Sequence, residues 1–122
     1  MLIPADVNHI AARQWAEGHR IPLITSEFVL VEVGNYLSPV AARRLFGQFS
    51  RALRSDSRIS VVSASSALLA RDLDLYESRS DKPWSLTDCI SFVIMQEQNV
   101  HDALTADRHF EQAGFTAILK QS

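Results

Sequence analysis

The sequence predicts an α/β fold with a mostly parallel sheet, and three observations support this prediction. The chain has 122 residues, a length that suits one domain built around one core. Its hydrophobic fraction of 47% and charged fraction of 21% are typical of globular proteins. Short apolar strands alternate with longer helical segments, a pattern that favours parallel strands joined by helices. We therefore expect residues 1–122 to form a single domain.

Capping and stop signals set the expected elements of the first half of the chain. Gly18 marks the end of the first helix, Ser26 caps the second and Pro39 begins the third. The second helix is apolar nearly all round, so we expect it to be buried. The expected elements are helix 6–17, strand 21–25, helix 27–37, helix 39–53 and strand 58–62.

The second half shows the same alternation. Ser65 caps a helix, and the segment "SRSDKPW" that follows this helix has the composition of a loop. Ser85 and Asp88 match a capping box at the start of the next helix. The expected elements are helix 65–77, helix 85–98, strand 102–105, helix 108–113 and strand 116–120.

Composition also excludes several classes of protein. A net charge of −2 and a pI near 6.0 give no overall basic character, so any nucleic acid would be held by a local patch. Cys89, the single cysteine, excludes an internal disulfide framework and a cysteine-based zinc site. No apolar stretch approaches the roughly 20 residues that span a bilayer, and no signal peptide is visible. We expect a soluble, cytoplasmic protein with no membrane partner.

Two aspartates occupy similar sequence contexts. Asp88 and Asp107 each follow a Leu-Thr pair closely, near the expected start of a helix. In a parallel sheet, ligands collect outside the carboxyl ends of the strands, where both side chains are expected to project. The alternative is purely structural, because either aspartate would also suit a helix cap.

Glu32 is the third acid of interest. It is flanked by Val31 and Val33 within a strongly apolar helix, where a carboxylate faces a large desolvation cost unless a polar cleft or a partner receives it. The structural alternative is a buried ion pair with an arginine. If the three acids meet, their mutual repulsion calls for a cation. Mg²⁺ or Mn²⁺ suits such oxygen ligands and can activate a water for attack on a phosphodiester.

Three segments, "TSEFVLVEVGNYL", "SLTDCISFVIMQEQNV" and "ALTADRHFEQAGF", together resemble the PIN-domain family, most closely its VapC-type toxin ribonucleases. The resemblance implies a three-layer α/β/α fold and an RNA-cleaving site that uses Mg²⁺ or Mn²⁺. By motif, Glu32 corresponds to the family's helix acid, Asp88 to its third acid and Asp107 to its fourth. Thr105 and Asn35 occupy positions that usually support the site.

The sequence departs from the family at its first acid. That aspartate normally lies on an opening strand, in a hydrophobic-Asp-Thr/Ser-Asn/Ser motif, whereas this chain begins "LIPADVNH", which resembles a later loop. Asp6 matches the acid of that loop, so we do not expect it to replace the first acid. We expect the first strand to be missing and the flanking strand edges to be exposed. An upstream start, a truncation or a decayed gene copy would each explain this, and metal binding by the remaining acids would be weaker.

The resemblance also implies partners and rival functions. VapC-type proteins form homodimers and bind a cognate antitoxin whose tail, often bearing an arginine, occupies the acidic cleft. The rival to a toxin ribonuclease is a catalytically impaired PIN remnant that only binds an antitoxin or RNA. A third possibility is a PIN nuclease that acts on DNA flaps or in RNA processing.

Other reactive or aromatic side chains are expected to be structural. Cys89 has no indicated histidine partner and suits a small packing site. His101 and His109 are expected to be surface or capping groups, because imidazole ligands suit zinc better than a magnesium site. Trp84, just before a helix cap, is expected to be a packing anchor.

Overall fold

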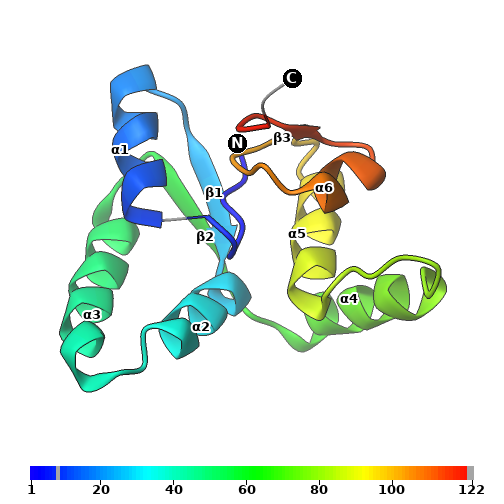
Figure 1. The fold of residues 1–122 in the computed structure, drawn as a ribbon, viewed down its shortest axis with the longest axis horizontal. Coiled ribbons are helices and arrows are strands. Elements are labelled where there is room, and N and C mark those ends of the chain that lie inside the picture. Colours follow the sequence, from blue (N-terminus) through cyan, green and yellow to red (C-terminus); the bar gives the residue numbers. More distant parts are fainter. Residues whose placement is uncertain (8, 121–122) are drawn as a thin grey trace.

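The computed structural model describes residues 1–7 and 9–120. Helices and short strands alternate along the chain, as the sequence predicts (Figure 1). The elements are α1 (His9–His19), β1 (Leu23–Ser26), α2 (Glu27–Tyr36), α3 (Val40–Ser55), β2 (Ile59–Val62), α4 (Ser66–Ser78), α5 (Leu86–Glu97), β3 (Asp102–Ala103), α6 (Arg108–Gln112) and β4 (Thr116–Ala117).

All of the strand pairings in the described part of the chain are parallel. β1 pairs with β2, with Leu23 opposite Ile59, and β3 pairs with β4. Leu2 connects the two pairs through parallel bridges to Ile24 and Ala103. The spatial order is therefore β2, β1, the segment around Leu2, β3 and β4.

The central position of the sheet is filled, although the sequence predicts that it is empty. The Leu2 amide donates to the Asp102 carbonyl at 3.0 Å, and the Leu104 amide donates to the Leu2 carbonyl at 2.9 Å. On the other side, the Ile3 amide donates to the Ile24 carbonyl at 2.9 Å. The prediction of exposed flanking edges is wrong, because the first three residues pair with both neighbouring strands.

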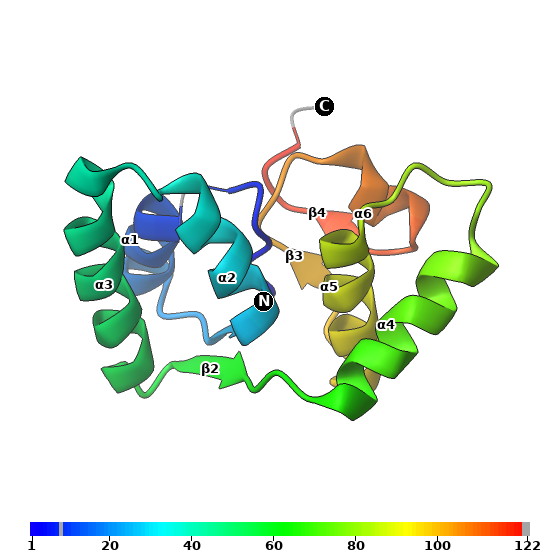
Figure 2. The same cartoon turned by 90° about the horizontal axis from the view of Figure 1, so that it is seen from below.

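Alternation along this short segment creates the three layers. Leu2 packs into the core beneath α5 with Ile90 and Phe92, whereas Ile3 packs on the opposite face with Ala12 and other residues around α1. Successive side chains of an extended segment point to opposite faces, so each face of the sheet is covered by helices. The predicted α/β/α arrangement is confirmed, and Figures 1 and 2 show α1 and α3 lying away from α4 and α5.

α5 is the most buried helix and holds the first layer in place. Its buried residues run without interruption from Cys89 to Met95. Phe92 makes edge-to-face contacts with Trp84 and Phe110, at ring-centroid distances of 4.9 Å. The predictions that Trp84 and Cys89 serve as buried packing residues are confirmed.

α2 is not buried all round, contrary to the prediction from its composition. Val29 and Leu30 are buried, but Val31 is 62% exposed and Tyr36 is 88% exposed. The helix contacts β1, α5 and α3 and lies between α3 and α5 in Figure 2. Hydrophobic composition alone cannot distinguish a buried face from one that lines an open cleft.

The boundaries of α1 matter for the site, because the chain turns just before it. The helix begins at His9 rather than near Asp6, and position 8 of the predicted helix lies outside the described residues. It passes through Gly18 and ends where Arg20 adopts a left-handed φ of 54°. Asp6 consequently lies in a turn after the central strand. No helix within the described ranges has the length and apolar character needed to cross a membrane.

Candidate active site

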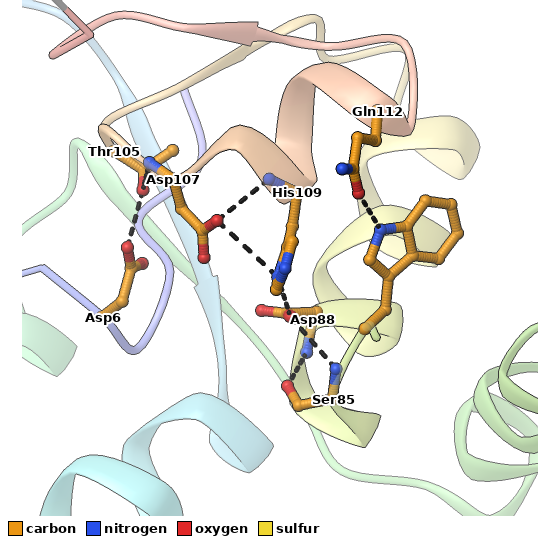
Figure 3. A network of polar contacts seen from close by, with 8 residues as sticks. Asp6, Ser85, Asp88, Thr105, Asp107, His109 and Gln112 are labelled. Carbon is orange, nitrogen blue, oxygen red and sulfur yellow. Dashed lines mark hydrogen bonds and ion pairs between the residues drawn. The ribbon is translucent and has the colours of Figure 1, made fainter. Parts of the chain in front are cut away.

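Asp6, Asp88 and Asp107 reach one place from three separate parts of the chain (Figure 3). Asp6 follows the central strand segment, Asp88 lies in the first turn of α5, and Asp107 caps α6 after β3. The prediction that Asp88 and Asp107 lie close together is confirmed. Asp6 lies beside them, where Thr105 donates to it, and whether it takes the role of the family's first acid stays open to experiment.

Asp88 and Asp107 also act as the helix caps considered as a structural alternative. The Ser85 amide donates to Asp88 Oδ2 at 3.1 Å, and the Asp88 amide donates to Ser85 Oγ at 3.0 Å. The His109 amide donates to Asp107 Oδ1 at 2.9 Å. Each cap uses one oxygen of the carboxylate and fixes the direction of the side chain. The second oxygen of each carboxylate takes no part in the cap.

Thr105 links Asp6 to Asp107 through its hydroxyl group. Thr105 Oγ1 donates to Asp6 Oδ2 at 2.7 Å and accepts from the Asp107 amide at 3.0 Å. The residue is buried, so this hydroxyl has a fixed environment. These contacts agree with the supporting position predicted for Thr105.

His109 joins the cluster, although the sequence analysis predicted a surface or capping group. Its Nδ1 atom lies 3.1 Å from Asp88 Oδ2 and 3.6 Å from Asp107 Oδ1. One potential ligand atom from each of these three residues lies within 4.8 Å of the other two. The short spacing between Asp107 and His109 was the available signal, since both lie at the start of one helical turn.

The pKa of the Asp6 carboxyl group is raised above its ordinary value. Partial burial is the main cause, and the negative charges of Asp107 and Asp88 add to it, while the hydrogen bond from Thr105 opposes it. Asp6 is therefore near enough to Asp107 and Asp88 to be affected by their charges, although within the described residues the close group of potential ligand atoms comes from Asp88, Asp107 and His109. The one sequence signal for this position is that Asp6-Val7-Asn8 contains an aspartate and an asparagine at the spacing of the first-acid motif, without its Thr/Ser.

Glu32 lies in the same cleft but outside the close group. With Asp6 and Asp88 it lines a cleft of about 780 Å³. Its side chain is exposed, so the predicted desolvation problem does not arise. Within the described residues, the Glu32 carboxylate forms no ion pair with an arginine. The glutamate of α2 that does so is Glu27, which accepts a hydrogen bond from Arg54 at 3.0 Å.

α2 and α3 also contribute apolar side chains to the lining of the cleft. Tyr36, Leu45, Phe46 and Phe49 contribute to it. Asn35 is exposed and does not belong to the lining. The supporting role of Asn35 stays a prediction.

The chemistry of the acidic group suits a hard divalent cation. Asp88 and Asp107 each bring a carboxylate oxygen into one close group, Asp6 lies beside them, and in the described part of the chain none of the three forms an ion pair with lysine or arginine. Close carboxylates repel each other unless a proton or a cation intervenes, and this repulsion adds to the effect of burial on the pKa of Asp6. Oxygen ligands of this kind fit Mg²⁺ or Mn²⁺.

Comparison with known proteins agrees with this geometry. Residues 2–116 match the model of the PIN domain family. A similar solved structure is that of Mycobacterium tuberculosis VapC20, described as a toxin that cleaves the sarcin-ricin loop; it is 18% identical, with a TM-score of 0.77 over 96% of this chain and 97% of that one. No curated protein matches the sequence. The match over nearly the whole chain shows that this protein belongs to the PIN-domain family.

Proposed function

We propose that this protein is a divalent-metal-dependent endoribonuclease, the toxin component of a toxin–antitoxin pair. The observation that carries the proposal is the close approach of Asp88 and Asp107, with Asp6 beside them, at a cleft that Asp6, Glu32 and Asp88 line. Family membership supports a nuclease, and the likeness to VapC20 supports RNA as its substrate.

Asp6, Asp88 and Asp107 would hold Mg²⁺ or Mn²⁺, and Glu32 would help to hold its waters. Such an ion, when bound, activates a water and offsets the charge that develops on the phosphodiester. The protein's own contribution is preorganisation. Thr105 fixes the Asp6 carboxylate by a 2.7 Å hydrogen bond, while the helix caps fix Asp88 and Asp107.

Removal of one charge from the cluster tests the proposal. Asp88→Asn keeps an oxygen that can accept from the Ser85 amide, so the helix cap is retained while the charge is lost. We expect RNA cleavage in Mg²⁺ or Mn²⁺ to fall by at least about a hundredfold. Asp74→Asn, an exposed position on α4, is the matched control and should cleave normally. Full activity in Asp88→Asn would refute the metal-binding role.

The cleft also supports the proposed antitoxin partner. An arginine would pair with the carboxylates at one end, and apolar side chains of the antitoxin would pack on the wall formed by Leu45 and Phe46. Leu45 is 49% exposed, so Leu45→Asp should preserve the fold. We expect this change to weaken antitoxin binding, measured by calorimetry. Unchanged affinity would place the antitoxin elsewhere.

Self-association is supported by an apolar stripe on α4. Leu69, Leu73 and Tyr76 are between 37% and 47% exposed, and their spacing places them along one side of the helix. We propose that this stripe contributes to a homodimer. Light scattering should show a dimer for the unchanged protein and a monomer for Leu73→Asp. A dimer that survives this substitution would assign the interface to another surface.

The binding-only alternative was motivated by a missing first aspartate. Asp6 lies beside Asp88 and Asp107, and we propose that its carboxylate takes the place of the missing acid. Metal-dependent cleavage by this chain would exclude the alternative, and profiling of RNA and DNA substrates would separate a toxin from a nuclease of DNA flaps.

A further inference from the structure

We propose that His109 contributes an imidazole nitrogen to the same cation, which makes the site prefer Mn²⁺ to Mg²⁺. The inference rests on the proposed function, because it concerns the ion that the acidic cluster would hold. A site made of carboxylates alone would have neither this nitrogen ligand nor this metal preference.

The His109 ring lies beside the carboxylates of Asp88 and Asp107. Nδ1 points between two carboxylates, 3.1 Å from Asp88 Oδ2 and 3.6 Å from Asp107 Oδ1 (Figure 3). The backbone beneath the ring is anchored on both sides. The His109 amide donates to Asp107, and the next residue, Phe110, is completely buried. The imidazole is therefore held at the cluster rather than swinging freely at the surface.

The distances from His109 Nδ1 to the two carboxylate oxygens are close to those between ligands of one ion. Adjacent ligands of an octahedral ion bound at about 2.1 Å lie roughly 3 Å apart. The 3.1 Å separation between the His109 nitrogen and the Asp88 oxygen matches this value, and the separation from the Asp107 oxygen is somewhat longer. The three side chains can thus supply neighbouring ligands to one ion.

The preference for Mn²⁺ over Mg²⁺ follows from the chemistry of the imidazole nitrogen. Mg²⁺ prefers oxygen and keeps several waters, so a nitrogen adds little to its binding. Imidazole suits first-row transition-metal ions better than it suits Mg²⁺. Mn²⁺ stands at the weak end of that series and also suits carboxylates, so it fits a site with two or more carboxylates and one nitrogen. Beside the ionised Asp88 carboxylate, which can only accept, Nδ1 donates the hydrogen bond. To bind an ion, Nδ1 must instead give its lone pair, so the ring proton moves to Nε2 and the cation takes the place of the Nδ1 proton.

Calorimetric titration of the full chain with Mn²⁺ and with Mg²⁺ tests the inference. His109→Gln replaces the nitrogen by an amide of similar reach. We expect this change to lower the preference, expressed as the Mg²⁺ Kd divided by the Mn²⁺ Kd, by about tenfold. His101→Gln is the matched control, because His101 is exposed and outside the cluster, and it should keep the preference of the unchanged protein.

A second measurement needs no variant. The Co²⁺-loaded protein should show a strongly shifted, exchangeable imidazole N–H resonance in its proton NMR spectrum, as expected for a metal-bound histidine. An equal loss of Mg²⁺ and Mn²⁺ affinity in His109→Gln would make His109 a positioning residue for Asp88 and overturn the inference. An unchanged preference, or no shifted imidazole resonance, would also overturn it while leaving the metal site intact. Failure of the unchanged protein to bind either ion would overturn the proposed function as well.

Discussion

At the scale of single residues, Thr105 shows how one hydroxyl can organise a charged site. It donates to Asp6 and accepts from the Asp107 amide, so it connects the end of the central strand segment to the start of α6. The sequence indicated this residue through its place in the family motif. It did not indicate the contact with Asp6, because these two residues are joined only by the folded sheet.

Thr105→Val should therefore change the titration of Asp6. In the unchanged protein, the hydrogen bond from Thr105 favours the ionised form of Asp6 and lowers the pKa of that carboxyl group. Loss of this hydrogen bond in Thr105→Val should therefore raise the pKa of Asp6 further. We also expect a loss of about 1 kcal/mol in the free energy of unfolding. Carboxyl-carbon NMR titration measures the first effect, and Thr105→Ser serves as the control that keeps the hydroxyl. An Asp6 pKa that does not respond to Thr105→Val would contradict this account.

Asp72 is a residue whose environment the sequence did not reveal. It lies on α4 with 1% of its surface exposed, and its Oδ1 atom has no hydrogen-bond partner within the described residues. Burial raises its pKa from an ordinary 3.8 to about 7. Between these two values the unfolded chain releases the proton and the folded chain retains it, so stability should fall as the pH rises from about 4 to 7 and level off above that range.

Asp72→Asn should remove this dependence on pH. We expect the variant to resemble the unchanged protein near pH 4 and to exceed its free energy of unfolding by roughly 2 kcal/mol at pH 8. Urea unfolding at both pH values measures the difference. Asp74→Asn, on the same helix but exposed, should behave like the unchanged protein. Equal stability of Asp72→Asn and the unchanged protein at pH 8 would show that the buried carboxylate carries no penalty.

At the scale of elements, the sequence predicted most of the helices because their signals are local. Ser26, Ser65 and Ser85 each accept a hydrogen bond from a backbone amide in the first turn, as their capping role requires. The lengths of the strands and the exposed faces of the helices depend on residues that are distant in sequence, so the sequence predicted them less well. The last strand pairs only at residues 116–117 of the predicted 116–120, and the open face of α2 depends on where α3 packs.

The packing of α2 on α3 also gives a testable contrast between two helical glycines. A Cβ atom on Gly34 would lie 3.0 Å from the ring of Phe46, whereas one on Gly47 would meet only the Arg51 side chain at 3.4 Å. Gly47→Ala should stabilise the protein by about 0.5–1 kcal/mol through helix propensity. Gly34→Ala should gain less or lose stability, because the Phe46 ring must move. Thermal unfolding compares the two, and an equal gain at both positions would rule out a tight contact.

At the scale of the whole molecule, the first three residues hold two halves together. β1 and β2 lie with α1–α3, β3 and β4 lie with α4–α6, and Leu2 bridges the two strand pairs (Figures 1 and 2). The sequence could not show this arrangement, because so short a segment has no measurable periodicity and its pairing is entirely long-range. The same segment leads directly to Asp6, so the pairing of the first three residues also decides where the Asp6 carboxylate lies.

Truncation of Leu2 tests this role at the centre of the sheet. The side chain is fully buried against α5, so Leu2→Ala should lower the free energy of unfolding by about 3 kcal/mol. Leu119→Ala is a useful reference, because that leucine is 41% exposed and should change stability little. Urea unfolding measures both variants. A loss below about 1 kcal/mol for Leu2→Ala would show that the segment does not hold the halves together.

The most direct test of the proposed cation site is a crystal structure of the protein with Mn²⁺, located by its anomalous scattering. The account predicts one ion about 2.1 Å from oxygen atoms of Asp6, Asp88 and Asp107. An ion bound elsewhere, or an acidic cluster that stays without an ion in millimolar Mn²⁺, would contradict it.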